Sequence, residues 1–418
     1  MNNKIKVLML GDHILSPSGI GTQSKYMAEA LLKTGKYQIV QLGGAIRHSD
    51  NRPMKFNEYG DDFIIYPVEG YGNADIIRSI VRTFRPDILF YITDPRFYIW
   101  LWQIENEIRP LVPFVYWHVW DNIPLPTYNK VLYESTDVIA TISKVTSHIV
   151  KNVAPNVEEI YLPHSINTEV FKRHSDEDII KFKNENLSFA KDKFVFFWNN
   201  RNARRKQSGS LIFWFKSFLD KVGHDKAMLL MHTDPKDPNG QDLNVIIHEL
   251  GLNNKQVLLS QDKLPPEHLA ILYNCVDTTI NIADAEGFGL GTLESLACET
   301  PIVVNMTGGL QEQVTDGKEW FGIGIEPCSK SIIGSQETPF IYEDRINEKD
   351  CVDALEKIYN MSKNDRREMG KKGRNHVLTN YNFEKFCKSW DELLTSVHER
   401  HGSWNNRKLY KSYELITL

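Results

Sequence analysis

The sequence predicts an α/β protein built from two doubly wound, mostly parallel sheets. Short apolar runs bounded by turn residues alternate with segments of helical periodicity, and this alternation occurs once in each half of the chain. A length of 418 residues suits two or three domains of roughly 100–200 residues each. Hydrophobic residues make up 41% of the chain and charged residues 25%, which excludes the disordered, collagenous and coiled-coil classes.

The first half contains apolar runs that we expect to be strands and periodic segments that we expect to be helices. The expected strands span residues 4–10, 37–42, 87–92, 113–117 and 137–142. The expected helices span residues 22–33, 75–84, 97–108 and 144–153. The first run stops at Gly11 and Asp12 with no small-residue cleavage site after it, so we interpret the N-terminus as a strand and not as a signal peptide.

The same pattern starts again in the second half. The expected strands there span residues 194–198, 227–231, 256–259, 278–282 and 301–304. The expected helices span residues 211–218, 243–250, 266–275, 292–298 and 351–361. Two sheets imply two domains, each with its own layer of helices.

The stretch 164–178 is polar and rich in turn residues, which is typical of a domain join. We therefore expect a first domain over 1–167 and a second over 168–380, with 381–418 returning to the first. That last segment carries one apolar stripe at helical spacings, and a helix with such a face must dock on another part of the protein. The stripe comprises Phe383, Phe386, Trp390, Leu393, Leu394 and Val397.

Charge and cysteine usage limit the possible partners and compartments. The 49 basic and 54 acidic residues give a net charge of −5, so bulk charge does not favour nucleic-acid binding. An odd number of widely spaced cysteines indicates a reducing compartment, and we expect a cytoplasmic protein. No apolar stretch approaches the ~20 residues that span a bilayer, so any membrane contact would be peripheral. The cysteines are Cys275, Cys298, Cys328, Cys351 and Cys387.

A glycine-rich segment follows the expected strand 278–282. Glycines 287, 289 and 291 let backbone amides approach a ligand, and a helix that begins near Thr292 adds a partial positive charge, so the segment resembles a phosphate cradle. Glu286 and Glu294 flank it and are suited to accept hydrogen bonds from sugar or ribose hydroxyl groups. The alternative is a tight turn with two solvent-facing glutamates, and the segment alone does not decide between them.

A basic cluster follows the expected strand 194–198. Arg201, Arg204, Arg205 and Lys206 place four cations within six positions at the carboxyl end of a strand, where open α/β sheets bind ligands. Arginine offers a bidentate fork and lysine a point charge, a combination that suits a diphosphate. The alternative is a solvated basic loop, which is the commoner role of such runs.

Two features of the first half are candidate site elements. Gly19 and Gly21 follow the first strand, but Ser24 stands where a dinucleotide fingerprint has its third glycine, so we expect a backbone loop that approaches a sugar or phosphate and not a nicotinamide site. His118 ends the strand 113–117 beside Trp117 and Trp120. A buried structural histidine is the alternative for that residue.

The metal-site patterns are weak, and we expect no essential metal. Asp176-Glu177-Asp178 has an Asp-x-Asp spacing, but Ser175 before it indicates a capped helix start. Asp284 and Glu286 also follow a strand, yet the adjacent glycine loop would neutralise a phosphate without a cation.

Taken together, these segments resemble the group 1 (family 4) glycosyltransferases, retaining enzymes with the two-domain GT-B fold. Residues 286–294 are similar to the family's Glu-x7-Glu signature, and Arg201 to Lys206 has the spacing of its phosphate-binding pair. Residues 308–312, 316–317, 19–21 and 162–171 resemble further segments of the family in the same order. The resemblance covers most of the chain.

The resemblance implies roles for these residues. Arg201 and Lys206 would neutralise the donor diphosphate, Glu294 would hold the ribose, and His118 would lie against the donor sugar or the acceptor. No nucleophile is implied, because such enzymes act by front-face attack. The donor sugar would be held by Glu286 with the segment Gly287, Phe288, Gly289 and Leu290, and the backbone loop of Gly19 and Gly21 would approach from the other domain.

The implied substrates are a nucleotide-diphosphate sugar as donor and a glycan, a lipid-linked sugar or a small molecule as acceptor, with no cofactor. A sugar-nucleotide epimerase, a phosphorylase and a non-catalytic nucleotide-sugar-binding protein are the alternatives. The sequence departs from the family at Arg204, at Arg205 and over 321–340. An apolar segment at 97–102 could face lipid, although a helix buried under the first sheet is the simpler explanation.

Overall fold

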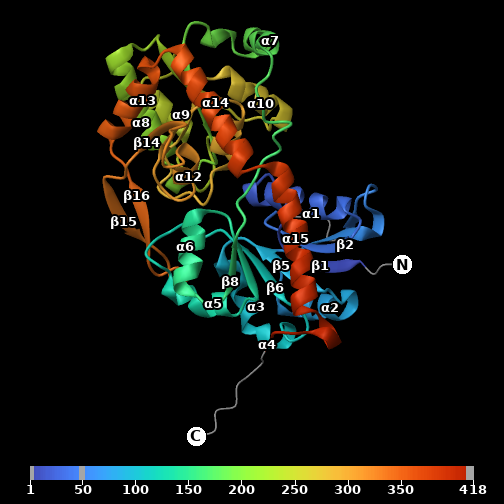
Figure 1. Cartoon of the computed structure of the whole chain (residues 1–418). Helices are drawn as coiled ribbons and strands as arrows, with labels where there is room; N and C mark the ends of the chain where they lie inside the picture. Colours follow the sequence, from blue (N-terminus) through green and yellow to red (C-terminus); the bar gives the residue numbers. More distant parts are fainter. Residues whose placement is uncertain (1–3, 47–51, 411–418) are drawn as a thin grey trace. The chain divides into compact units, whose positions relative to one another are not determined.

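The computed structural model describes residues 4–46 and 52–410 (Figure 1). The chain divides into two compact units, each built around one sheet whose strands are all or mostly parallel. The first unit contains the residues up to His164, the segment Gly334–Pro339 and the residues from Glu384 onward. The second contains Ser165–Ile333 and Phe340–Phe383. The predicted domains, 1–167 with 381–418 and 168–380, remain predictions.

The first unit has an eight-stranded sheet in the order β3-β4-β2-β1-β5-β6-β7-β8. Only the short pair β3 and β4 is antiparallel among these strands. The chain builds outward from β1 on one side and then returns to its other side with β5, so the strand order reverses between β1 and β5. The strands are β1 (Ile5–Asp12), β2 (Tyr37–Gly44), β3 (Met54–Lys55), β4 (Phe63–Pro67), β5 (Ile88–Ile92), β6 (Phe114–His118), β7 (Val138–Thr141) and β8 (Glu158–Tyr161).

Three helices of the first unit begin directly after a polar capping residue. Ser18, Asn73 and Ser143 each accept a backbone hydrogen bond at the start of a helix. The helices that follow these caps and the strands are α1 (Gly19–Lys33), α2 (Ala74–Phe84), α3 (Ile99–Gln103), α4 (Glu105–Ile108), α5 (Lys130–Glu134) and α6 (Lys144–Val153), with 3-10 turns η1 (Gly60–Asp62), η2 (Pro95–Tyr98) and η3 (Thr127–Asn129).

The predicted single helix over 97–108 is wrong. The segment forms η2, α3 and α4, with a break at Ile104, where φ is −114° and ψ is 17°. Tyr98, Leu101 and Trp102 are buried, and their packing takes precedence over a regular helix. Phe97 and Ile99 are exposed at 43% and 38%, so only part of this segment lies in the core.

The C-terminal helix α15 (Phe383–His401) packs on the sheet of the first unit, as its apolar stripe predicted (Figure 1). Trp390 is fully buried, and its ring lies 5.4 Å from that of Phe90 on β5 and 4.6 Å from that of Trp117 on β6. Lys36 also donates to Asp391 at 2.7 Å. The turn η6 (Trp404–Asn406) continues this attachment, since the Trp404 indole donates to the carbonyl oxygen of Pro86.

The second unit has a six-stranded parallel sheet in the order β11-β10-β9-β12-β13-β14. The chain runs from β9 outward through β10 and β11, and then returns to the other side of β9 with β12. The strand order therefore reverses between β9 and β12. The strands are β9 (Phe194–Asn199), β10 (Ala227–His232), β11 (Val257–Ser260), β12 (Thr278–Asn281), β13 (Ile302–Asn305) and β14 (Gly322–Ile325).

Helices cover both faces of this second sheet. Phe196 contacts Phe215 and Phe218 of α8, whereas the next residue, Phe197, contacts Tyr273 of α10, so these two helices lie on opposite faces. The helices are α7 (Asp176–Asn186), α8 (Ser208–Val222), α9 (Leu243–Glu249), α10 (Pro266–Cys275), α11 (Leu290–Ala297), α12 (Leu310–Val314), α13 (Glu348–Asn360) and α14 (Lys363–Asn380), with 3-10 turns η4 (Ser188–Ala190) and η5 (Arg204–Lys206).

All the predicted strands are present, with ends displaced by two residues or fewer. Ser175 accepts from the Asp178 amide at the start of α7, so the Asp-Glu-Asp segment is the predicted capped helix start. β15 (Ser329–Ile333) lies within the stretch 321–340 where the sequence departs from the family, and it forms an antiparallel hairpin with β16 (Ile341–Arg345), which directly follows that stretch.

Candidate active site

The candidate site of the second unit lies at the carboxyl ends of β9 and β12. The basic loop continues from Asn199 at the end of β9, and the glycine-rich loop continues from Asn281 at the end of β12. These two strands are neighbours at the point where the strand order reverses. Open α/β sheets bind ligands at such points, so the fold brings the two predicted loops together where a ligand is expected.

Each cation of the basic loop has a partner within the second unit. Arg201 donates to both carboxylate oxygens of Asp237, at 2.6 and 3.1 Å. Arg204 donates to both oxygens of Glu343, at 2.9 and 2.5 Å. The remaining two bind the glycine-rich loop: Arg205 donates to the carbonyl oxygen of Ala285, and Lys206 to the carboxylate of Glu286.

Lys206 and Glu286 form a buried ion pair between the two loops. Their side chains are only 9% and 11% exposed. Burial acts to raise the pKa of Glu286, but the charges of Lys206 and Arg205 and the hydrogen bonds from Lys206 and Asn281 outweigh it and lower that pKa to about 2. Glu286 is therefore ionised at neutral pH. Both hydrogen bonds go to Oε2, and within the described residues none goes to Oε1.

Glu294 lies within α11 at the end of a short hydrogen-bonded chain. The Tyr273 hydroxyl donates to Glu294 Oε2 at 2.9 Å, and Asn199 Nδ2 donates to the Tyr273 hydroxyl at 2.9 Å. A Cβ at Gly291 would meet the Asn199 carbonyl oxygen at 3.1 Å, so α11 approaches the end of β9 closely. Burial raises the pKa of Glu294 to about 7, and the Tyr273 hydrogen bond opposes this only in part.

The segment after β13 donates hydrogen bonds to the backbone of the glycine-rich loop. Gly309 donates its amide to the carbonyl oxygen of Glu286 at 3.0 Å. The fully buried Gln313 donates to the carbonyl oxygens of Phe288 and Gly289, at 2.7 and 3.1 Å. Gly289 has φ +91° and precedes Leu290, the first residue of α11. The loop from Glu286 to Leu290 is thus a fixed cradle of backbone.

Gly308 is expected to be intolerant of any side chain. Its φ is +49°, and an added Cβ would fall on the carbonyl oxygen of Glu286. We expect Gly308→Ala to lower the free energy of unfolding by about 3 kcal/mol, since backbone strain and a steric clash add together. Gly317→Ala is the matched control, because Gly317 also has positive φ, +88°, but open space around it. A cost of about 1 kcal/mol is expected there, and equal losses in urea unfolding would contradict the close approach.

The β15–β16 hairpin adds charged residues to the edge of this site. Glu343 binds Arg204 and also accepts from Arg345 at 2.9 Å. Arg345 in turn lies 2.6 Å from Asp284, which leads into the glycine-rich loop. Burial raises the pKa of Asp284 to about 6, although Gln207 and Arg345 oppose the shift. A further backbone bond from Asp344 to Asp284, at 2.9 Å, fixes β16 beside the loop.

The two glycines of the predicted loop in the first unit form the first turn of α1, which begins three residues before the predicted helix start at residue 22. Gly19 is the first residue of α1 and is exposed. Gly21 is buried, and its amide donates to the Ser18 side chain at 2.9 Å. A Cβ at Gly21 would approach the Ser16 carbonyl oxygen to 2.8 Å, so the sequence requires glycine there for packing. A ligand role for this loop remains a prediction.

His118 ends β6 as predicted, within a buried aromatic cluster of the first unit. Its side chain is 0% exposed, and Nε2 lies 2.7 Å from the Tyr133 hydroxyl. Burial lowers the pKa of His118 to about 3, so the imidazole is neutral. Nδ1 is buried and has no hydrogen-bond partner in the part of the chain that the structure describes. The predicted contact of His118 with a sugar remains a prediction.

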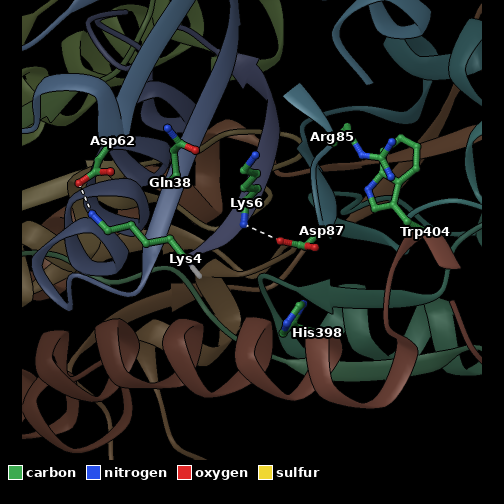
Figure 2. Close-up of a pocket in the computed structure, with 8 residues that line it drawn as sticks. All are labelled: Lys4, Lys6, Gln38, Asp62, Arg85, Asp87, His398 and Trp404. Atoms are coloured by element: carbon green, nitrogen blue, oxygen red, sulfur yellow. Dashed lines mark hydrogen bonds and ion pairs between the residues drawn. The ribbon is translucent and has the colours of Figure 1, made fainter. Parts of the chain in front are cut away.

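A hollow of 610 Å³ lies in the first unit at the amino-terminal ends of the strands (Figure 2). Its opposite charges are largely satisfied: Lys4 pairs with Asp62, and Asp87 accepts from the Lys6 amide at 2.9 Å. Arg85 stacks on the ring of Trp404 at 4.2 Å. The hollow lies at the amino-terminal ends of the strands, whereas Gly19 and Gly21 follow the carboxyl end of β1. It is therefore not part of the predicted site.

Within residues 4–46 and 52–410, no group of three or more His, Cys, Asp or Glu side chains could hold a metal ion. No helix there is long and apolar enough to cross a membrane.

Sequence reasoning missed the residues that hold the predicted ones in place. Tyr273 lies in the predicted helix 266–275, and its sequence position gave it no role in the site. Asp237 and Glu343 are distant from the basic loop in the sequence, and no spacing pattern connects them to Arg201 or Arg204. Gln313 directly follows the segment 308–312 that resembles a family motif, and this proximity was the one available signal.

The fold is that of the GT-B class. Sucrose-phosphate synthase from Thermosynechococcus elongatus superposes with a TM-score of 0.74 at 15% identity, over 95% of this chain and 100% of that chain. Anabaena HepE, solved with UDP and glucose, superposes with a TM-score of 0.65 at 14% identity, over 94% of this chain and 100% of that chain. At such identities these structures establish the architecture alone.

Residues 178–376 match the family model for glycosyl transferases group 1. Short stretches also match D-inositol 3-phosphate glycosyltransferases. The relative from Acidothermus cellulolyticus is 44% identical over 55 residues, 13% of this chain and 12% of that protein. The relative from Corynebacterium jeikeium is 38% identical over 76 residues, 18% of each chain. The matches thus span less than a fifth of these curated relatives.

Proposed function

We propose that the chain is a retaining glycosyltransferase that moves a sugar from a nucleotide-diphosphate donor to an acceptor. The observation that carries the proposal is the buried Lys206–Glu286 pair, which joins the basic loop to the glycine-rich loop at the reversal of strand order. The family match of residues 178–376 supports the same reading. Solved complexes of the similarly folded HepE contain UDP and UDP-glucose, which makes UDP-sugars the first donors to test.

The cationic side chains, the carboxylates and the histidine of the site would have different roles. Arg201 and Lys206 would stabilise the negative charge that grows on the diphosphate as the glycosidic bond breaks. Glu294 would accept hydrogen bonds from the ribose hydroxyls. Glu286 would accept from a sugar hydroxyl through Oε1, with the backbone of Gly287 to Leu290 alongside. His118 is neutral and 0% exposed, so its proposed contact with the sugar or the acceptor would require the aromatic residues around it to move.

The first small acceptors to test are phosphorylated polyols and sugars. Proteins similar to this chain are named for D-inositol 3-phosphate, sucrose phosphate and trehalose 6-phosphate. Glycans and lipid-linked sugars follow, with peripheral membrane contact in the lipid case. We propose a cytoplasmic location for the reaction, because nucleotide sugars and reduced cysteines share that compartment.

The test is a screen of the purified chain against UDP-, GDP- and ADP-sugars, first with chelator and then with added Mg²⁺. Thermal stabilisation by one donor, with release of nucleoside diphosphate that rises when an acceptor is added, is the expected result. NMR of the product should show the donor's anomeric configuration retained. Release without dependence on any acceptor would favour an epimerase, and stabilisation without release would favour a binding protein.

A further inference from the structure

We propose that Arg204 is an additional cation for the donor diphosphate and that Glu343 holds its guanidinium until the diphosphate competes for it. This inference rests on the proposed function, because it requires a nucleoside diphosphate beside the loop that follows β9. The family resemblance assigns Arg201 and Lys206 to the diphosphate and gives Arg204 no role. The exposure of Arg204, the second partner of Glu343 and the chemistry of the guanidinium group support the assignment.

Exposure separates the cations of the basic loop into two groups. The side chains of Arg201 and Arg204 are 64% and 51% exposed, whereas that of Lys206 is 9% exposed. Arg205 is tied to the carbonyl oxygen of Ala285. A diphosphate that approaches from solvent would therefore reach the guanidinium groups of Arg201 and Arg204 more readily than the ammonium group of Lys206.

Glu343 can release Arg204 without becoming an isolated buried charge. Its side chain is only 4% exposed, and it binds Arg345 as well as Arg204. If Arg204 turned toward a phosphate, Arg345, which also pairs with Asp284, would still donate a charge-assisted hydrogen bond to Glu343. The Lys206–Glu286 pair differs, because loss of Lys206 would leave Glu286 with only the Asn281 amide as a direct hydrogen-bond donor among the described residues.

The chemistry of the exchange is favourable. A guanidinium fork binds phosphate oxygens in the same bidentate way as a carboxylate, and a diphosphate carries more charge than one carboxylate. Arg204 shares the single turn of η5 with Lys206, so both cations lie at the same edge of the sheet. Glu343 and the diphosphate would thus compete for one cation at the site.

The experiment is calorimetric titration of UDP, GDP and ADP into the whole chain and its variants. Arg204→Gln should weaken binding of the preferred nucleotide by roughly three- to tenfold, since one charge-assisted contact is lost. Glu343→Gln should tighten binding by roughly threefold, because it removes the competitor and keeps the side-chain shape. The double variant should bind like Arg204→Gln, since the gain needs Arg204. The nucleoside without phosphates should be insensitive to all three changes.

Glu107→Gln is the control for the loss of one negative charge. Glu107 holds Arg78 in the first unit by two bonds of 2.7 Å, the same bidentate pairing away from the site. This variant should leave nucleotide affinity unchanged. Arg204→Lys is a second variant in case Glu343→Gln does not fold: it keeps the charge without the fork, and it should bind more tightly than Arg204→Gln.

The outcomes distinguish this inference from the proposed function. Suppose that the wild type binds a nucleoside diphosphate, and that Glu343→Gln and Arg204→Gln weaken binding equally with similar losses of thermal stability. The Arg204–Glu343 pair then only stabilises the fold, and the inference is wrong. If Arg204→Gln leaves affinity unchanged, it is also wrong. If the wild type binds none of the three nucleotides, both the proposed function and this inference are overturned.

Discussion

Lys206→Met is expected to lower both turnover and stability, and the two losses should be separable. Removal of Lys206 takes away a cation from the proposed diphosphate site, with an expected loss of roughly 100-fold in turnover. It also leaves the buried carboxylate of Glu286 without its main partner, which costs about 3–5 kcal/mol in the free energy of unfolding. The large effect on folding follows from the burial of this pair, which the basic cluster in the sequence does not indicate.

The double variant Lys206→Met/Glu286→Gln separates the two effects, because it removes both charges together. Much of the stability should return in urea unfolding, whereas turnover should stay low. Lys216→Met is the matched control: Lys216 pairs with Asp220 on the surface of the same unit, with side chains 34% and 49% exposed. Such a pair contributes about 1 kcal/mol or less. A double variant as unstable as Lys206→Met would contradict the proposed cause.

The pH dependence of unfolding provides a further check on Glu286. In the wild type its pKa is lowered to about 2, so its contribution to stability is complete above an unfolded pKa near ~4.3 and is lost as the pH falls toward 2. In Lys206→Met, burial acts with less opposition and raises the pKa of Glu286. The variant should therefore lose more stability relative to wild type at pH 7 than at pH 4.

The fold was predictable wherever burial produces a regular apolar pattern. The central strands are apolar runs because both faces are covered, and all of them were predicted. The strands that were missed lie at or near sheet edges: β8 has half-buried and exposed residues, and β14 alternates glycine with isoleucine. Helix α14 was missed because its buried face is Gly370, Gly373, His376 and Val377, which gives almost no apolar signal.

The candidate site was predictable to the extent that its chemistry lies in short segments. Arg201, Lys206, Glu286 and Glu294 follow strands at recognisable spacings, and the adjacency of β9 and β12 places their loops together. The partners of these residues were not predictable, because pairing depends on distance in space. Glu343 meets Arg204 across 139 positions of sequence, by way of a hairpin whose polar strands carry no strong pattern.

Glu294→Gln is expected to weaken nucleotide binding by roughly tenfold and to remove most of its pH dependence. An ionised carboxylate accepts hydrogen bonds from ribose hydroxyls more strongly than an amide does, and charge-assisted bonds contribute about 1.5–3 kcal/mol. The pKa of Glu294 is raised to about 7, so wild-type affinity should increase as the pH rises from 6 to 8. Calorimetric titration of the preferred nucleoside diphosphate across this range is the measurement.

The same raised pKa predicts an opposite change in stability. Between an unfolded pKa near ~4.3 and the folded value of about 7, the folded chain keeps a proton that the unfolded chain has lost, so the contribution of Glu294 to stability falls as the pH rises. Glu294→Gln should thus be more stable than wild type at pH 8 while binding nucleotide more weakly.

Tyr273→Phe removes the hydroxyl that donates to Glu294, so the pKa of Glu294 should rise further. Nucleotide affinity equal to that of the wild type should then be reached only at a higher pH. If Glu294→Gln kept full affinity at pH 8, Glu294 would not hold the ribose.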